Sequence, residues 1–410
     1  MSTMTASAPP ATSLRQDAGV IGLVGLAHMI SHYGQLLLAP LFPWLKDAFG
    51  ASYTELGFLM TLFFVVSCSV QAVSGFLVDR YGPRPILFGG LALLATAAFG
   101  YALSRGYWTM AIFSVLAGVG NGVFHPVNYT LLNRNVSPPR LGHAYSFHGI
   151  TGSLGWALAP AMLVPLAIVF SWRTALMAAG ALALAVLGVM WLYRARLALP
   201  ASAPRHAAAA HAEGTFEFLR IPAVWMCFAF FFFYAVVLSV IQAFAPEAAR
   251  QLHGVPVALA AMCLTVYMVC SAGGMVRGGF LASDPARCER VVGMGFGVAA
   301  LVALVIGVGT VPALAVPALF GAMGFASGIA GPSRDLLVKR STPENATGRV
   351  YGIVYSGLDI GQAISPLIFG ALMDHQQYRG VWLGLVFMQA VLITSAFNVR
   401  RVRRTALTTA

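Results

Sequence analysis

The chain has 410 residues, of which 59% are hydrophobic and only 9% are charged. Soluble domains carry roughly 25% charged residues, so this composition excludes an ordinary soluble protein and is typical of one that crosses a lipid bilayer. The formal net charge of +12 would suit a nucleic-acid partner, but the positions of the basic residues favour a membrane-orientation signal instead, and we expect no nucleic acid.

Twelve apolar runs are long enough for transmembrane helices, each of which needs about 20 mostly apolar residues. Barrel strands would instead alternate in segments of about ten residues. The sequence therefore predicts an all-α integral membrane protein. The predicted spans are 18–43, 54–78, 84–104, 107–134, 142–168, 172–194, 221–249, 256–281, 290–309, 311–341, 347–374 and 379–400.

Residues 1–17 are polar and rich in Ser, Thr, Ala and Pro, and we expect them to form a disordered cytoplasmic tail without a cleavable signal peptide. Nineteen Lys and Arg residues fall on the side of the two termini, five fall in the opposite loops, and Arg334 falls inside a span. This positive-inside bias predicts that both termini are cytoplasmic. We expect a multi-pass protein of the plasma membrane, the inner membrane in a bacterium.

The first span carries a polar stripe. His28, His32 and Gln35 recur at i, i+4 and i+7 and therefore share one helix face. His125 and Asn128 of the fourth span are expected to face this stripe across a central cavity. Polar groups near the bilayer centre are costly unless they are paired or hydrated, so these five residues are candidates for substrate binding.

The histidines allow three interpretations. Imidazole changes charge near neutral pH, which favours a cavity-lining role with His32 in proton coupling. The rings could instead donate to backbone carbonyls at a helix interface, or they could bind a transition metal. A His-x3-His pair is a weak metal signal, and no acidic residue lies close by in sequence. The five cysteines form no CxxC pair, so we predict no metal site, no disulfide and no cofactor.

The loop after the second span reads Gly-Phe-Leu-Val-Asp-Arg-Tyr-Gly-Pro-Arg from residue 75. This segment closely resembles the loop signature of the major facilitator superfamily. In that family the cluster latches one conformation, and its small residues let helices approach closely. The resemblance implies a gating role, with Asp79 expected to pair with a basic residue such as Arg134. The predicted gating residues are Gly75, Asp79, Arg80, Gly82, Arg84 and Arg134.

Residues 195–220 form the one long polar stretch between spans and divide the helices six and six. We expect a cytoplasmic linker here. It separates an N-terminal six-helix bundle, 18–194, from a C-terminal one, 221–400, which a cytoplasmic tail, 401–410, follows.

The two halves repeat each other. A shift of 206 residues matches glycines, prolines and an arginine without a gap. Parallel six-helix repeats related by an axis along the membrane normal are the architecture of major facilitator transporters, whose halves rock about a central site. The sequence therefore predicts two parallel pseudo-symmetric bundles. Among the matches are Gly118 with Gly324, Gly122 with Gly328, Pro126 with Pro332, Arg134 with Arg340, and Ala39-Pro40 with Ala245-Pro246.

Within that superfamily the N-terminal half resembles the fosmidomycin-resistance group of exporters. The resemblance implies export, but three departures remove charged groups of the pattern, at His32, at Val127 and near Ser114, so the fosmidomycin substrate is not carried over. The residues that carry the resemblance are His28, His32, Gln35, Ala39, Pro40, Gln71, Gly118, Gly120, Gly122, Phe124, His125, Pro126, Phe147, Ser153, Gly155 and Pro160.

The C-terminal half breaks the symmetry with charge. The 206-residue shift places Arg334 on Asn128, and a cavity-facing arginine could bind a carboxylate or phosphonate through two hydrogen bonds. Asp359, near mid-depth in the eleventh span, could carry a coupled proton. Alternatively Arg334 pairs with Asp335 or Asp359 and holds helices together. Tyr234 could line the cavity wall.

These features predict a monomeric secondary transporter that moves a small anionic organic molecule by alternating access coupled to protons. Efflux of a drug-like or metabolic compound is placed ahead of uptake, and the partners are the substrate, protons and the bilayer. The alternatives are proton-coupled uptake of a small carboxylate and a transporter-like membrane sensor or receptor. The sequence has no nucleophile–base pair, P-loop or metal cluster that would favour an enzyme.

Overall fold

A computed structural model describes residues 13–199, 222–281, 288–341 and 347–408, without the side chains of residues 223, 335–341, 347–355 and 396–408. All regular structure in these ranges is helical, and twelve helices are long and apolar enough to cross a membrane. The predicted number of spans and the all-α class are confirmed.

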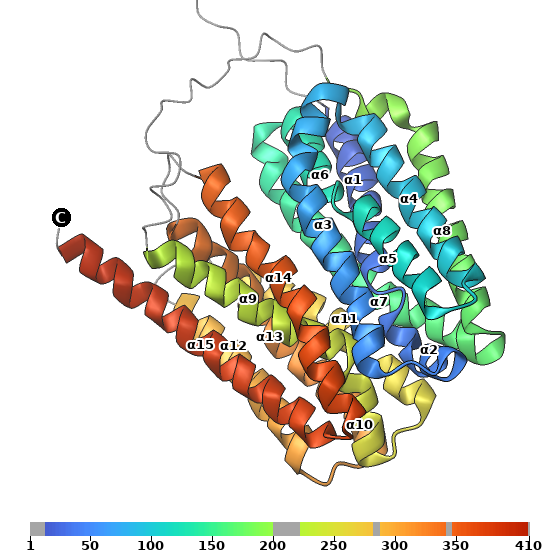
Figure 1. Cartoon of the computed structure of the whole chain (residues 1–410). Helices are drawn as coiled ribbons and strands as arrows, with labels where there is room; N and C mark the ends of the chain where they lie inside the picture. Colours follow the sequence, from blue (N-terminus) through green and yellow to red (C-terminus); the bar gives the residue numbers. More distant parts are fainter. Residues whose placement is uncertain (1–12, 200–221, 282–287, 342–346, 409–410) are drawn as a thin grey trace, which may run out of the picture.

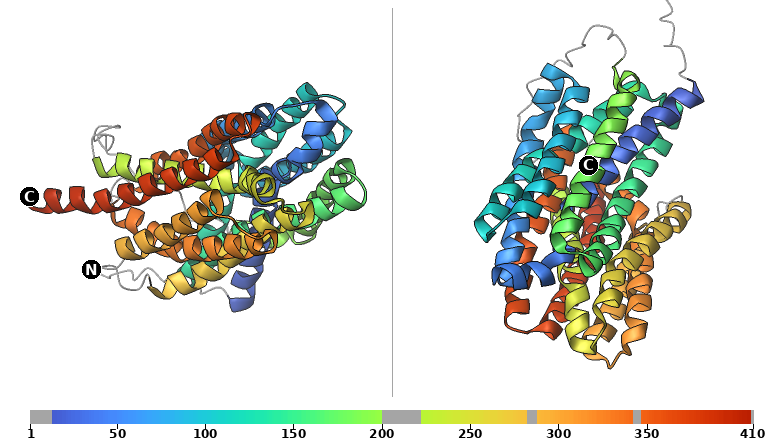
Figure 2. Two further views of the ribbon diagram at one scale, coloured as in Figure 1. Left: turned by 90° about the horizontal axis from the view of Figure 1, so that it is seen from below. Right: turned by 90° about the vertical axis from the view of Figure 1, so that its right-hand side faces the viewer.

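The helices form two bundles, blue to green and yellow to red in Figure 1, which Figure 2 shows from two further sides. The first bundle contains α1 (Leu14–Gln35), α2 (Phe42–Phe49), α3 (Tyr53–Tyr81), α4 (Pro83–Leu103), α5 (Tyr107–Asn121), α6 (Phe124–Asn135), α7 (Leu141–Val169) and α8 (Trp172–Leu192). The second contains α9 (Pro222–Ala243), α10 (Ala245–His253), α11 (Val257–Leu281), α12 (Cys288–Val308), α13 (Val316–Ser341), α14 (Thr347–Asp374) and α15 (Tyr378–Thr408).

The first span of each bundle is interrupted where the sequence predicted a continuous helix. Helix α1 ends at Gln35, and a short 3-10 turn over Ala39–Leu41 leads into α2. In the second bundle α9 ends at Ala243 and α10 begins at Ala245. The repeated Ala-Pro pair begins the 3-10 turn in the first bundle and the helix α10 in the second. Proline has no N–H to donate and its ring clashes with the preceding turn, so it ends a helix at this depth.

The fourth span is also divided, and here the bundles differ. Helix α5 ends at Asn121, and α6 starts at Phe124 after a turn at Gly122 and Val123. Its counterpart α13 continues without a break although Pro332 lies inside it. The sequence predicted that His125 lies in the middle of a helix. Because of the break, His125 lies in the first turn of α6 instead.

The first helix begins inside the segment predicted to be a disordered tail. Ser13 caps α1 by accepting a hydrogen bond from the Gln16 amide, while the Gln16 side chain accepts one from the Ser13 amide. This capping box starts the helix at Leu14, before the predicted boundary at residue 18. At the other end α15 runs to Thr408, past the boundary at residue 400. Residues 1–12 and most of the predicted linker lie outside the described residues.

The glycines that the 206-residue shift matches have the same packing role in both bundles. A Cβ atom at Gly118 or Gly122 would collide with carbonyl oxygens of Phe63 and Ser67 on α3. At the equivalent Gly324 and Gly328 it would collide with carbonyl oxygens of α11, at residues 267 and 271. Small residues let these helix backbones touch, which is how helices associate where lipid offers no hydrophobic driving force.

The two bundles meet mainly along α3 and α14 and along α7 and α11. At one end the carboxylate of Asp374 accepts hydrogen bonds from the amides of Tyr53 and Thr54, with N···O distances of 2.6 and 2.9 Å. Further along, Thr61 Oγ1 donates to the carbonyl of Ala363 over 2.6 Å. Asp374 of α14 thus caps the start of α3 in the opposite bundle and holds the two bundles together at this end.

Beyond Gln71 large side chains on one face of the same helix are exposed. Val73, Phe76 and Tyr81 of α3 are 53%, 75% and 57% exposed. Figure 1 shows α3 and α14 close together at the end near α2 and α10 and diverging toward the end from which the grey linker trace leaves. The bundles are therefore joined at the end opposite the linker and separated at the linker end.

Candidate functional site

Four histidines of the first bundle lie together. The ring centroids of His28 and His32 on α1 are 4.2 Å apart, and His125 on α6 lies 5.4 Å from His28 and 6.2 Å from His32. His148 of α7 stacks on His28 with centroids 3.5 Å apart. The structure thus brings the predicted stripe and His125 into one cluster. We call His28, His32, His125 and His148 the imidazole cluster.

The cluster is connected to the second bundle through Gln71 of α3. The Nδ1 atom of His125 lies 2.9 Å from Gln71 Oε1. Gln71 Nε2 donates to Asp359 Oδ2 of α14 over 3.4 Å. An amide that donates to a carboxylate must present its oxygen to the ring, so His125 donates from Nδ1 and keeps an acceptor lone pair on Nε2.

One face of α7 closes the cluster, and the sequence analysis gave it too little weight. His148, Gly152 and Trp156 recur every four residues and so share this face. The Trp156 ring lies 4.2 Å from that of His32, and its Nε1 donates to Gln35 Oε1 over 2.9 Å. His148 was not among the predicted site residues, and the i, i+4, i+8 spacing was the signal that could have placed it there.

Asn128 lies behind the cluster. It is fully buried, and its Nδ2 is 3.3 Å from Nε2 of His148. Val127 and Ser114, where the exporter pattern has charged groups, are also fully buried, and Ser114 bonds to the Tyr101 hydroxyl over 3.0 Å. This wall of the first bundle therefore presents neutral polar groups and imidazoles.

The second bundle contributes a cation held by aromatic rings. The guanidinium of Arg334 on α13 lies 4.4 Å from the ring centroid of Tyr234 and 5.5 Å from that of Phe231, both on α9. Cation–π contacts of this kind fix the position of a guanidinium against aromatic rings. Among described side chains, the recorded partners of Asp359 are Gln71 and Cys68 of α3. The side chain of Asp335 lies outside the described residues.

The predicted gating residues lie at the linker end. Gly75, Asp79, Arg80, Arg84 and Arg134 are exposed there, and Gly82 adopts a positive φ of 84° that favours glycine. The ion pair recorded at this end joins buried Asp17 of α1 to Arg140, and Ser137 Oγ also donates to Asp17 over 2.5 Å. Asp17, assigned to the disordered tail, is instead part of the helix packing.

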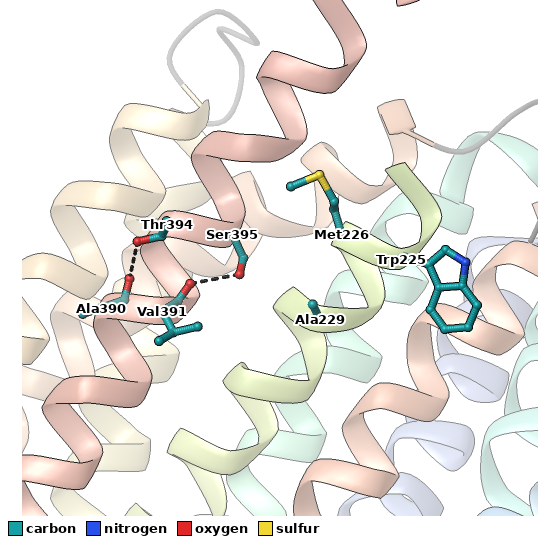
Figure 3. Close-up of a pocket in the computed structure, with 7 residues that line it drawn as sticks. All are labelled: Trp225, Met226, Ala229, Ala390, Val391, Thr394 and Ser395. Carbon is teal, nitrogen blue, oxygen red and sulfur yellow. Dashed lines mark hydrogen bonds between the residues drawn. The ribbon is translucent and has the colours of Figure 1, made fainter. Parts of the chain in front are cut away.

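A surface groove lies elsewhere. It measures about 400 Å³ and lies between α9 and α15 (Figure 3). None of the predicted site residues lines it, and its walls are mostly apolar, so we do not assign it to the site. Its lining residues are Trp225, Met226, Ala229, Ala390, Val391, Thr394 and Ser395.

Comparison with known protein families shows to which family the chain belongs. The sequence matches the Major Facilitator Superfamily over residues 24–366. The chain belongs to the Major Facilitator Superfamily. The predicted family is thereby confirmed, and the two bundles are the two halves of its fold.

Among superfamily relatives, the chain is 27% identical over 154 residues to the fosmidomycin resistance protein of Escherichia coli, which covers 38% of each chain. It is 31% identical over 157 residues to the membrane sensor protein UhpC of Escherichia coli, covering 37% of this chain and 35% of the other. These matches thus span little more than a third of the relatives' length. A hexuronate transporter of Bacillus subtilis is 23% identical over 87% of each chain.

Solved structures of superfamily members agree with the fold. A bacterial homolog of the human lysosomal transporter Spinster, in an inward-facing and occupied conformation, superimposes with a TM-score of 0.78 at 15% identity, over 95% of this chain and 98% of the other. The nucleoside transporter NupG gives a TM-score of 0.73 at 13% identity, over 93% and 99%. At these identities the likeness concerns the fold alone.

Proposed function

We propose that the chain is a secondary transporter that works by alternating access and that the structure corresponds to its cytoplasm-facing state. The observation that carries this proposal is the one-sided contact between the bundles. Hydrogen bonds join them from Tyr53 to Gln71 of α3, whereas side chains of α3 nearer the linker are exposed. The basic residues that gather at the linker end support a cytoplasmic location for that end and for both termini.

The proposed substrate is a small organic anion. Tyr234 and Phe231 position Arg334 through ring contacts, and a guanidinium is the side-chain group that binds a carboxylate or phosphonate through two parallel hydrogen bonds. The imidazole cluster would supply polar contacts from the first bundle, with Asn128, predicted to bind substrate, behind it as a hydrogen-bond partner of His148. Arginine on one bundle and neutral polar groups on the other suit a cargo with one charged and one polar end.

We propose that Asp359 carries the coupled proton. Its carboxylate bridges to the first bundle through Gln71, and an ionised acceptor strengthens such a bond about twofold. Protonation would weaken the bridge and so favour separation of the bundles. His32, the other residue proposed for coupling, belongs to the imidazole cluster, for which we argue a different role below.

Export is placed ahead of uptake because the first bundle is similar to proteins named for resistance. These are the fosmidomycin resistance protein and a multidrug resistance protein B homolog of Mycobacterium tuberculosis, 25% identical over 162 residues. Proton-coupled uptake of a small carboxylate is the alternative, supported by the hexuronate transporter that matches along most of its length. Similarity to UhpC supports the third candidate, a membrane sensor. The bacterial origin of these relatives supports a location in a bacterial inner membrane.

The test begins with the purified full chain. A thermal-shift screen of carboxylates, phosphonates and antibiotics identifies a ligand, and radiolabelled flux into proteoliposomes is then measured with and without an imposed pH gradient. We expect accumulation of an anion that depends on the gradient. Binding without flux in either direction would support the sensor, and flux indifferent to the pH gradient would contradict proton coupling.

A further inference from the structure

We propose that His28, His32 and His125 form a binding site for a divalent transition-metal ion such as Zn²⁺, Co²⁺ or Ni²⁺. One ring nitrogen from each of the three residues can be chosen so that all lie within 4.8 Å of one another. The ligands come from two helices, with His28 and His32 one turn apart on α1 and His125 at the start of α6. The sequence showed only a weak pair on one helix, and the break after α5 adds the third ligand.

Two of the rings have nitrogen atoms that no protein group uses. The Nδ1 atoms of His28 and His32 are buried and make no hydrogen bond within the described part of the chain. The side chains themselves are 2% and 9% exposed. A buried polar atom without a partner costs about 1–3 kcal/mol, and such an atom in a native structure indicates a missing partner. A cation that accepts lone pairs would be that partner.

The third ring is prepared for a metal by its hydrogen bond to Gln71. Because His125 Nδ1 donates to Gln71 Oε1 over 2.9 Å, its Nε2 lone pair is free to coordinate. Metal-bound histidines nearly always donate their other ring N–H to an oxygen, which fixes the tautomer and raises the basicity of the ligand. Gln71 also donates a hydrogen bond to Asp359. The carboxylate of Asp359 is thus connected to the ligand His125 through Gln71.

The space between the rings exists because residue 152 is a glycine. A Cβ atom there would lie 2.9 Å from His28 Nε2 and 2.9 Å from His32 Nδ1. Tetrahedral zinc with bonds of about 2.0–2.1 Å needs ligand atoms roughly 3.3 Å apart, so ring nitrogens that now lie within 4.8 Å of one another must approach by up to about 1.5 Å. Rotation of the side chains can supply this movement only while no side chain at residue 152 stands between them.

The donor set selects the metal. Three imidazoles suit Zn²⁺, Co²⁺, Ni²⁺ and Cu²⁺, whereas Mg²⁺ and Ca²⁺ need oxygen ligands. His148 is not counted as a ligand because its Nε2 faces the Asn128 amide at 3.3 Å, and it instead stacks on His28 and fixes that ring. Three protein ligands leave a fourth tetrahedral position for water or for a donor atom of the cargo.

The experiment measures equilibrium binding, so its result does not depend on whether flux is found. Full-length protein purified with a tag that lacks histidine is titrated with Zn²⁺ by calorimetry, with Mg²⁺ in parallel. We expect one Zn²⁺ per chain with micromolar or tighter affinity and no heat with Mg²⁺. Co²⁺ is then added, and the intense visible absorption of tetrahedral Co²⁺ is expected in place of the weak bands of the octahedral ion.

Matched variants locate the site. His32→Ala and His125→Ala each remove one of three ligands and should weaken Zn²⁺ binding by at least about 100-fold, and Gln71→Leu should weaken it by about 10–100-fold. Gly152→Ala should weaken it at least about tenfold by filling the space between the rings. Gly149→Ala, on the same helix with no atom within 4 Å of its added Cβ, and His143→Ala, exposed at the bundle edge, should bind as the parent does.

Three results would overturn the proposal. The first is an absence of stoichiometric Zn²⁺ binding, and the second is an octahedral Co²⁺ spectrum. The third is a Zn²⁺ affinity that survives His32→Ala and His125→Ala but falls with His143→Ala, which would mean surface binding. Melting curves check that the variants are folded, and Gln71→Leu tests the same site without altering a ligand if a histidine variant fails to fold.

Discussion

Gln71 and Asp359 join the two bundles near the end of their contact, with Gln71 Nε2 3.4 Å from Asp359 Oδ2. The first residue belongs to α3 and the second to α14, the helices along which the bundles meet. A change of charge at Asp359 therefore acts on a bond that exists only while the bundles are together.

The first prediction concerns this bond. Asp359→Asn keeps the size and an acceptor oxygen but cannot release a proton. We expect gradient-driven accumulation in proteoliposomes to fall at least about tenfold, while exchange of labelled for unlabelled substrate persists. Exchange needs alternating access alone, so loss of both would assign Asp359 to folding or substrate binding. Asp47→Asn, exposed at the end of α2, is the control.

The second prediction concerns Asp374, which caps α3 and joins the two bundles at the end opposite the linker. Asp374→Ala removes the acceptor for the Tyr53 and Thr54 amides and for the Thr54 hydroxyl. Loss of a charged helix cap costs about 1–2 kcal/mol, which corresponds to roughly a tenfold shift in a conformational equilibrium. We expect the open-outward population to grow. Distances between spin labels on the two bundles at that end measure it, and an unchanged distribution would remove Asp374 from closure.

The third prediction separates substrate binding from structure at Arg334. Arg334→Ala should weaken binding of anionic ligands by about 1.5–3 kcal/mol, the range for charged hydrogen bonds, with little effect on neutral ones. Tyr234→Phe keeps the aromatic face on which the guanidinium lies and should bind normally, whereas Tyr234→Leu should not. Equal losses for neutral and anionic ligands in isothermal titrations would point to a structural arginine.

The fourth prediction tests the buried ion pair at the linker end. Asp17 is fully buried and pairs with Arg140, whose side chain is 32% exposed. Arg140→Ala leaves a buried carboxylate without its cation, at a cost of about 1–3 kcal/mol after allowance for solvent screening at the arginine. We expect a lower melting temperature in detergent. Arg134→Ala, an exposed arginine on the preceding helix, should melt close to the parent.

The repeat and the spans were predictable because they rest on long patterns. Hydrophobic runs of bilayer length and a constant 206-residue offset each draw on many positions, so local errors cancel. Helix ends depend on single caps and were less accurate. The Ser13–Gln16 capping box that starts α1 was visible in the sequence but was outweighed by the polar composition of the segment.

The candidate site was predictable in part. Spacing on one helix placed His28 beside His32, and the repeat pointed to Arg334. Spacing could not reveal that α6 begins anew at Phe124, nor that Gln71 connects His125 to Asp359. Such contacts join residues 54 and 288 positions apart, and only the packing of helices determines them.

The difference between equivalent positions, Asn128 in one half and Arg334 in the other, has a consequence for the cargo. The pseudo-twofold axis relates the backbones of the two halves, yet it exchanges a neutral amide for a permanent cation. A molecule between the halves would therefore have a preferred orientation, with its anionic group toward the second half throughout the cycle. Binding in one orientation and not the reversed one would then arise from a fold that is itself nearly symmetric.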